Sequence, residues 1–127
     1  MVYGDASGQN LKTTGTSDFQ IIKQFFAGTP YRYADYRVPK SNPAVRDRVQ
    51  LVNSKLKNAA GDVNMRISPR CKELIKDLEQ VTYKPDSTVM DKDRDPKRTH
   101  LSDALGYLIW QESRTHVRFG EQPMRLL

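Results

Sequence analysis

Apolar residues recur along the chain at two characteristic spacings, and glycine, proline and charged residues separate the segments that carry them. Alternating, β-branched and aromatic residues predict three strands, over residues 1–3, 31–38 and 63–67. Apolar spacings of three and four residues predict four helices, over residues 18–27, 43–60, 69–81 and 99–112. The resulting order is strand, helix, strand, helix, strand, helix, helix, which is typical of an α/β domain around a small, mostly parallel sheet.

Local signals define where the first two helices begin. Ser17 followed by Gln20 matches a capping box, although the aromatic and β-branched residues of 18–27 are also compatible with a strand. Asn42 before Pro43 predicts the start of the second helix, because asparagine caps and proline suits the first helical position.

The composition describes one basic, soluble domain. The 127 residues suffice for a single core, and residues 113–127, which show no clear period, are expected to form a less ordered tail. The 21 Lys and Arg residues against 15 Asp and Glu give a net charge of +6, which favours an anionic partner such as nucleic acid. The single cysteine, Cys71, excludes an internal disulfide, and its place on the apolar stripe of its helix predicts a buried thiol.

The first motif with candidate chemistry is Gly4-Asp5-Ala6-Ser7-Gly8, directly after the first predicted strand. A carboxylate at a strand end provides a hard oxygen ligand for a divalent cation, and small neighbours let a phosphate approach the backbone. An ordinary turn after a strand explains the same residues, and both interpretations stay open. Because the chain begins within this strand, we expect it to be a piece of a longer polypeptide.

The second motif starts at Thr99 and ends at Tyr107. His100 and Asp103 are three residues apart, so they share one side of a helix that Thr99 or Ser102 is expected to cap. The alternative interpretation is that Asp103 supports the helix macrodipole while His100 lies at the surface.

The third motif is Asn42-Pro43-Ala44-Val45-Arg46-Asp47-Arg48. Asp47 lies opposite the apolar stripe of Val45, Val49 and Val52, on a polar face that looks either into a cleft or into water. The charged residues of 84–98 predict a loop, with a DNA contact as the second interpretation.

Together, these three motifs resemble the C-terminal nuclease domain of tailed-bacteriophage terminase large subunits, over residues 2–112. The resemblance implies a reduced ribonuclease H-like fold that forms one nuclease domain over residues 1–127. It also implies an endonuclease that cuts concatemeric viral DNA by two-metal phosphodiester hydrolysis. The ATPase domain of the terminase would then belong to a missing N-terminal part of the chain.

The resemblance also assigns roles to individual residues. Asp5 matches the first-strand metal ligand, Asp103 matches the last-helix ligand, and His100 is similar to a metal-proximal histidine of some members. The middle acid is Asp47, with Asp35 as the alternative. The implied catalytic and metal-binding residues, which would hold two Mg²⁺ or Mn²⁺ ions, are Asp5, Asp47, Asp103 and His100. The implied contacts to DNA phosphates are Lys12, Arg46, Arg48, Lys97 and Arg98.

The implied partners are double-stranded DNA, the terminase ATPase domain, the terminase small subunit and the portal. No stretch of the sequence predicts a membrane span or a signal peptide, so we expect a protein of the bacterial host cytoplasm that is not secreted. The alternative function is a non-catalytic module of the same fold that docks on DNA or protein.

Overall fold

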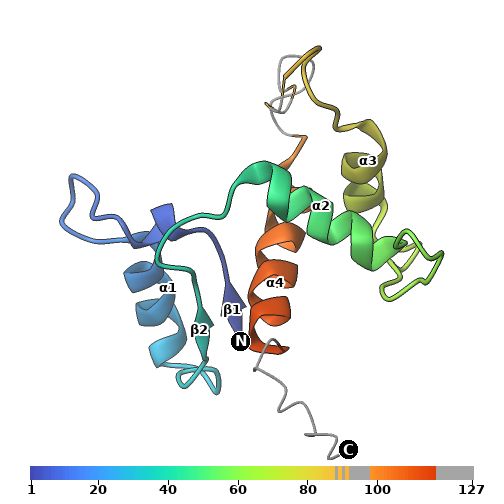
Figure 1. Cartoon of the computed structure of the whole chain (residues 1–127). Coiled ribbons are helices and arrows are strands. Elements are labelled where there is room, and N and C mark those ends of the chain that lie inside the picture. Colours follow the sequence, from blue (N-terminus) through green and yellow to red (C-terminus); the bar gives the residue numbers. More distant parts are fainter. Residues whose placement is uncertain (88, 90, 92–97, 117–127) are drawn as a thin grey trace, which may run out of the picture.

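The computed structural model describes residues 1–87, 89, 91 and 98–116 of this mixed α/β protein. Its elements in chain order are β1 (Val2–Tyr3), the short 3-10 helix η1 (Ala6–Gln9), α1 (Asp18–Ala27), β2 (Tyr36–Arg37), α2 (Val45–Leu56), α3 (Lys72–Gln80) and α4 (His100–His116). Figure 1 shows α4 between two groups, with β1, β2 and α1 on one side and α2 and α3 on the other. Because α4 packs against α2, α3 and β1, it is the element that joins both groups.

The sheet of the described residues consists of two short parallel strands. Tyr3 of β1 pairs with Arg37 of β2, and the N–H of Val2 donates to the carbonyl of Asp35 at 2.7 Å. The parallel pairing is as predicted, but the strand expected over 31–38 is limited to Tyr36–Arg37. The preceding residues form turns instead, in which Ala34 N–H bonds to its near neighbour's carbonyl rather than to a neighbouring strand.

The strand predicted over residues 63–67 is absent in the described part of the chain. Asn58 and Asp62 close a turn around Gly61, whose φ of +90° suits glycine. The N–H of Asn64 then donates to the carbonyl of Lys55 near the end of α2, at 3.0 Å. These residues bond to the end of a helix, and an alternating pattern forms a strand only where a partner strand is available.

The capping box at the start of α1 is confirmed. The Ser17 hydroxyl accepts from the N–H of Gln20 at 3.3 Å, and the Gln20 side chain accepts from the N–H of Ser17 at 2.7 Å. Phe19 then packs beneath the turn after β1. A Cβ on Gly4 or Gly8 would lie 2.8 or 2.6 Å from its ring, so both glycines are needed for this close packing.

Helix α2 begins two residues later than predicted and ends earlier. Its first residue is Val45 and its N-cap position is Ala44, while the side chain of Asn42 bonds elsewhere instead of capping the helix. The helix ends at Leu56, well before Gly61. Of the predicted apolar stripe, Val52 is 5 % exposed and forms the apolar centre of the contact with α4.

Helices α3 and α4 differ from the prediction in what they bury. Cys71, expected to be a buried thiol, is exposed at the N-cap position of α3, because the helix begins only at Lys72. The residue of α3 that is buried is Asp77, at 2 % exposure. Helix α4 extends to His116, into the expected tail, and residues 117–127 lie outside the described residues. None of the described helices combines the length and the apolar character needed to cross a bilayer.

Candidate functional site

Asp5 lies where β1 runs into η1, and one of its carboxylate oxygens organises the turn. Oδ1 accepts hydrogen bonds from the N–H of Ser7 at 2.7 Å, from the N–H of Gly8 at 3.3 Å and from the Ser7 hydroxyl. Three donors on one oxygen hold the carboxylate in a single orientation. Within the described residues, Oδ2 of Asp5 accepts no hydrogen bond.

Asn42 reaches the same turn from the segment that follows β2. Its Oδ1 accepts from the N–H of Ala6 at 2.7 Å, one residue after Asp5. The side chain predicted to cap α2 therefore joins the two parallel strands at the end where both chains leave the sheet.

The first turn of α4 is fixed by a carboxylate from α3. Oδ2 of Asp77 accepts from three backbone N–H groups at the helix start, at 3.1–3.3 Å, and Oδ1 pairs with Arg98 at 3.4 Å. The N–H donors are those of Thr99, Leu101 and Ser102. Neither predicted capping side chain, Thr99 nor Ser102, performs this role. Thr99 has a φ of +101° and a buried hydroxyl without a hydrogen-bond partner among the described residues. The hydrogen bonds to Asp77, called the Asp77 clamp below, therefore hold a strained residue in place.

Asp103, on the same turn, is paired with a buried arginine of α2. Nη2 of Arg48 donates to Oδ1 of Asp103 at 2.6 Å, and Nη1 lies 3.5 Å from the carbonyl oxygen of Asp103. The guanidinium stacks over the ring of Tyr107 with 4.1 Å between its Cζ and the ring centroid. Arg48 is 4 % exposed, whereas the side chain of Asp103 retains 28 % exposure. Within the described residues, Oδ2 of Asp103 has no partner.

The pKa of Tyr107 depends on burial and on three nearby charged side chains. Burial raises the pKa of the Tyr107 phenol, Arg48 lowers it, and the negative charges of Asp5 and Asp103 raise it further. The contact between β1 and α4 brings together residues that are almost a hundred positions apart in the sequence.

Carboxylate oxygens of the kind that hard divalent cations prefer are present at both aspartates. Asp5 and Asp103 each have one carboxylate oxygen that is unbonded within the described residues, and Mg²⁺ and Mn²⁺ prefer such oxygen ligands. The amide oxygen of Asn42 is already engaged by the N–H of Ala6, the residue after Asp5. A cluster of three or more His, Cys, Asp or Glu side chains spaced for a metal ion is not found among the described residues.

The other predicted ligands lie at exposed positions. Asp47 is exposed on the first turn of α2 and forms no hydrogen bond or ion pair within the described chain. Asp35 is exposed and pairs with Arg37 at 2.8 Å. His100 is the first residue of α4 and is exposed. The structure packs β1, which precedes Asp5, against α4, which carries Asp103, and the roles of all five residues at a metal stay predictions.

The predicted DNA-contacting residues are distributed differently. Arg46 is exposed on α2 and forms no ion pair among the described residues, while Lys12 pairs with Asp18. Arg98 pairs with two carboxylates of α3. The guanidinium of Arg48 faces Asp103 and Tyr107 rather than solvent, and Lys97 lies outside the described residues. No finding tests their contacts with phosphate, which stay predictions.

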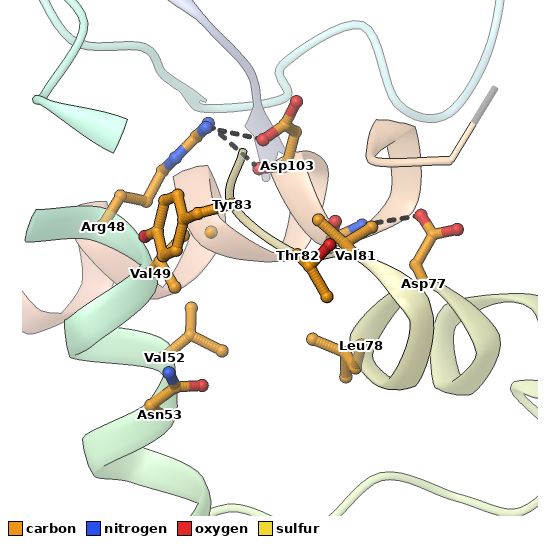
Figure 2. Close-up of a pocket in the computed structure, with 12 residues that line it drawn as sticks. Arg48, Val49, Val52, Asn53, Asp77, Leu78, Val81, Thr82, Tyr83 and Asp103 are labelled. Carbon is orange, nitrogen blue, oxygen red and sulfur yellow. Dashed lines mark hydrogen bonds and ion pairs between the residues drawn. The ribbon is translucent and has the colours of Figure 1, made fainter. Parts of the chain in front are cut away.

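A pocket of about 170 Å³ adjoins the Arg48–Asp103 pair, between α2, α3 and α4. In Figure 2 the pair closes one end of the pocket, and Val52 and Leu78 point toward each other from α2 and α3. The lining combines apolar side chains such as Val52 and Leu78 with polar ones such as Asn53 and Ser102.

Sequence reasoning missed three residues of the site: Asn42 as a partner of the Asp5 turn, Asp77 as the cap of α4, and Arg48 as the partner of Asp103. A weak signal existed for Arg48, because Gly106 in the middle of a helix indicates close packing by another element. No signal in the sequence pointed to Asp77.

Comparisons with protein-family models, with curated protein sequences and with solved structures found no match for this chain.

Proposed function

We propose that this chain is a divalent-metal-dependent DNA endonuclease of the terminase type, with a reduced ribonuclease H-like fold. One observation carries the proposal: β1, which leads directly into Asp5, packs against α4, which carries Asp103 on its first turn. The sequence motifs that contain these two aspartates are those that resemble the first and last metal-ligand segments of terminase nucleases.

In this proposal, Asp5 and Asp103 hold Mg²⁺ or Mn²⁺, with Asp47 and His100 as the further members of the site and Asp35 as the alternative to Asp47. A cation bound there would polarise the scissile phosphate and make the attacking water more acidic. The protein fixes the two carboxylates beforehand, through the Ser7 and Gly8 donors at Asp5 and through Arg48 at Asp103. Concatemeric double-stranded DNA is the proposed substrate, and the exposed Arg46 would contact its phosphates.

The test is cleavage of supercoiled plasmid by the purified chain in the presence of Mn²⁺. We expect Asp5→Asn and Asp103→Asn each to lower the cleavage rate at least about 100-fold, because a lost carboxylate ligand weakens metal binding and activation. Both substitutions preserve side-chain shape, so urea unfolding curves will show whether the fold is intact. Glu73→Gln, an exposed carboxylate change on α3, is the matched control and should cleave like the wild type.

Wild-type cleavage by folded Asp5→Asn or Asp103→Asn protein would contradict the proposal. Asp47→Asn and Asp35→Asn, compared in the same assay, identify the middle acid, because only the residue that serves the site should lower the rate.

A second candidate function is a non-catalytic docking module of the same fold. The Arg48–Asp103 pair favours it, since an ion pair with a buried arginine gives Asp103 a role without any metal. Titration of the ¹⁵N-labelled protein with Mg²⁺ distinguishes the two functions. A nuclease should show signal changes clustered at Asp5 and Asp103, whereas a docking module should show none there.

A further inference from the structure

Arg48 is held both at its guanidinium and along its aliphatic stem. Its Nη2 donates to Asp103 Oδ1 at 2.6 Å, its Cζ lies 4.1 Å from the centroid of the Tyr107 ring, and only 4 % of the side chain is exposed. The pairing, the stacking and the burial act together, so movement of the guanidinium away from Asp103 would require all three to be lost.

The aliphatic part of Arg48 is fixed as well. It crosses α4 at Gly106, where a Cβ would lie 2.8 Å from both Cγ and Cδ of Arg48. A glycine in the middle of α4 costs helix stability compared with alanine, yet here it creates the groove that seats the arginine. The position of Arg48 is therefore built into the packing of α2 against α4 and does not depend on the ion pair alone.

This arrangement has a consequence for any cation that binds at Asp103. One of its carboxylate oxygens is already occupied by a permanent positive charge, because arginine does not lose its proton in proteins. An incoming divalent ion meets the remaining oxygen and the repulsion of a guanidinium that its surroundings hold in place.

We propose that Arg48 is a positioning residue that stays paired with Asp103, restricts this carboxylate to a single oxygen for a divalent cation, and weakens the affinity of the site for that cation. The inference rests on the proposed function, because it concerns the metal site of Asp5 and Asp103. Its new element is that the guanidinium of Arg48, on α2, places a fixed positive charge beside the proposed metal site.

In the first experiment the whole chain is titrated with Mn²⁺, and binding is measured by calorimetry and by the electron paramagnetic resonance signal of free Mn²⁺. Arg48→Met removes the charge and keeps an unbranched side chain in the groove. We expect it to bind Mn²⁺ at least about tenfold more tightly than the wild type, as removal of a nearby unit charge predicts. Arg48→Lys keeps the charge and should stay within about threefold of the wild type on the same argument. Lys57→Met, at the exposed end of α2, is the control for a general change in net charge.

The second experiment uses the wild-type protein and does not depend on how a variant folds. The ¹⁵N signals of the Arg48 guanidinium are followed by NMR during titration with Mg²⁺. We expect slow guanidinium rotation, the sign of the ion pair, to persist at saturation. Release of Arg48 at saturation would overturn the inference.

The outcomes separate failure of the inference from failure of the proposed function. If wild-type protein binds Mn²⁺ and Asp103→Asn binds it weakly, but Arg48→Met equals the wild type, the inference is overturned and the metal site stands. If wild-type protein binds no Mn²⁺, or if Asp103→Asn binds it unchanged, the proposed metal site is overturned and the inference with it.

Discussion

Two arginine–carboxylate pairs connect α4 to the rest of the molecule, one at each end of the helix. Near its start, Asp103 pairs with Arg48 of α2 at 2.6 Å, and farther along, Glu112 pairs with Arg37 of β2 at 2.5 Å. The distances are almost equal, but the surroundings differ. Arg48 and Asp103 are 4 % and 28 % exposed, whereas Arg37 and Glu112 are 32 % and 33 % exposed.

The surroundings of an ion pair therefore determine how much it stabilises the fold, more than the distance between its charged atoms does. The pair at Asp103 lies next to an aromatic face and a glycine groove, so its loss leaves an unpaired charge in a packed interface. The pair at Glu112 is open to water, which screens the interaction and can replace either partner. We therefore expect α4 to be held mainly at its N-terminal end.

The largest effect on stability is expected from Asp77→Ala, which removes the Asp77 clamp on the first turn of α4. Three backbone N–H groups lose their acceptor, one in a buried and two in a part-buried place, and the free energy of unfolding should fall by about 2–4 kcal/mol. Urea unfolding followed by circular dichroism measures this change. Glu73→Ala removes an exposed carboxylate from the same helix and should have a much smaller effect. Equal losses in the two variants would contradict the view that burial makes the difference.

A smaller effect is expected from Gly106→Ala, which fills the groove under Arg48. The added Cβ overlaps the arginine stem, an overpacking that costs about 1–3 kcal/mol, while the helix gains up to about 1 kcal/mol from alanine. We expect a net loss of stability in thermal unfolding. Gly28→Ala, at a position with nothing within 4 Å, is the matched control and should not destabilise the protein. A Gly106→Ala protein as stable as this control would show that the groove is not needed.

The smallest effect is expected at the Glu112 end and concerns the ionisation of Tyr3. The hydrogen bond to Glu112, 2.6 Å long, raises the pKa of Tyr3 above its ordinary value of 10.0. Folding therefore favours the protonated phenol, and this contribution to stability is full below pH 10 and is lost as the pH rises through the folded-state pKa. Glu112→Gln should lower the pKa of Tyr3 and leave that of Tyr107 unchanged. NMR of ¹³Cζ-labelled tyrosine measures both, and an unchanged Tyr3 pKa would contradict the assignment.

Features that depend on neighbouring residues in the chain were predicted well. The capping box of Ser17 and Gln20, the first strand and the helical character of α1, α2, α3 and α4 are all present. Predictions failed where a distant segment supplied the partner. Asn42 caps no helix because its amide bonds to the turn after β1, and the cap of α4 comes from α3.

The candidate site follows the same division. Asp5 and Asp103 were chosen from sequence motifs, and the structure packs the elements that carry them, β1 and α4, against each other. The positive partner of Asp103 was not foreseen, because Arg48 was predicted from the sequence to contact DNA phosphates. Only the approach of α4 at Gly106 buries Arg48 in a contact between the two helices.

The sequence by itself determined which segments become helices, where the first carboxylate stands after β1, and that the chain carries a net charge of +6. Tertiary structure alone decided that Asp77 and Arg48 are buried, that Asn42 serves the Asp5 turn, and that α4 is the element between the two groups. The physical reason is that capping and periodicity are satisfied within a few residues. The burial of a charged side chain depends instead on a partner that the fold brings from elsewhere in the chain.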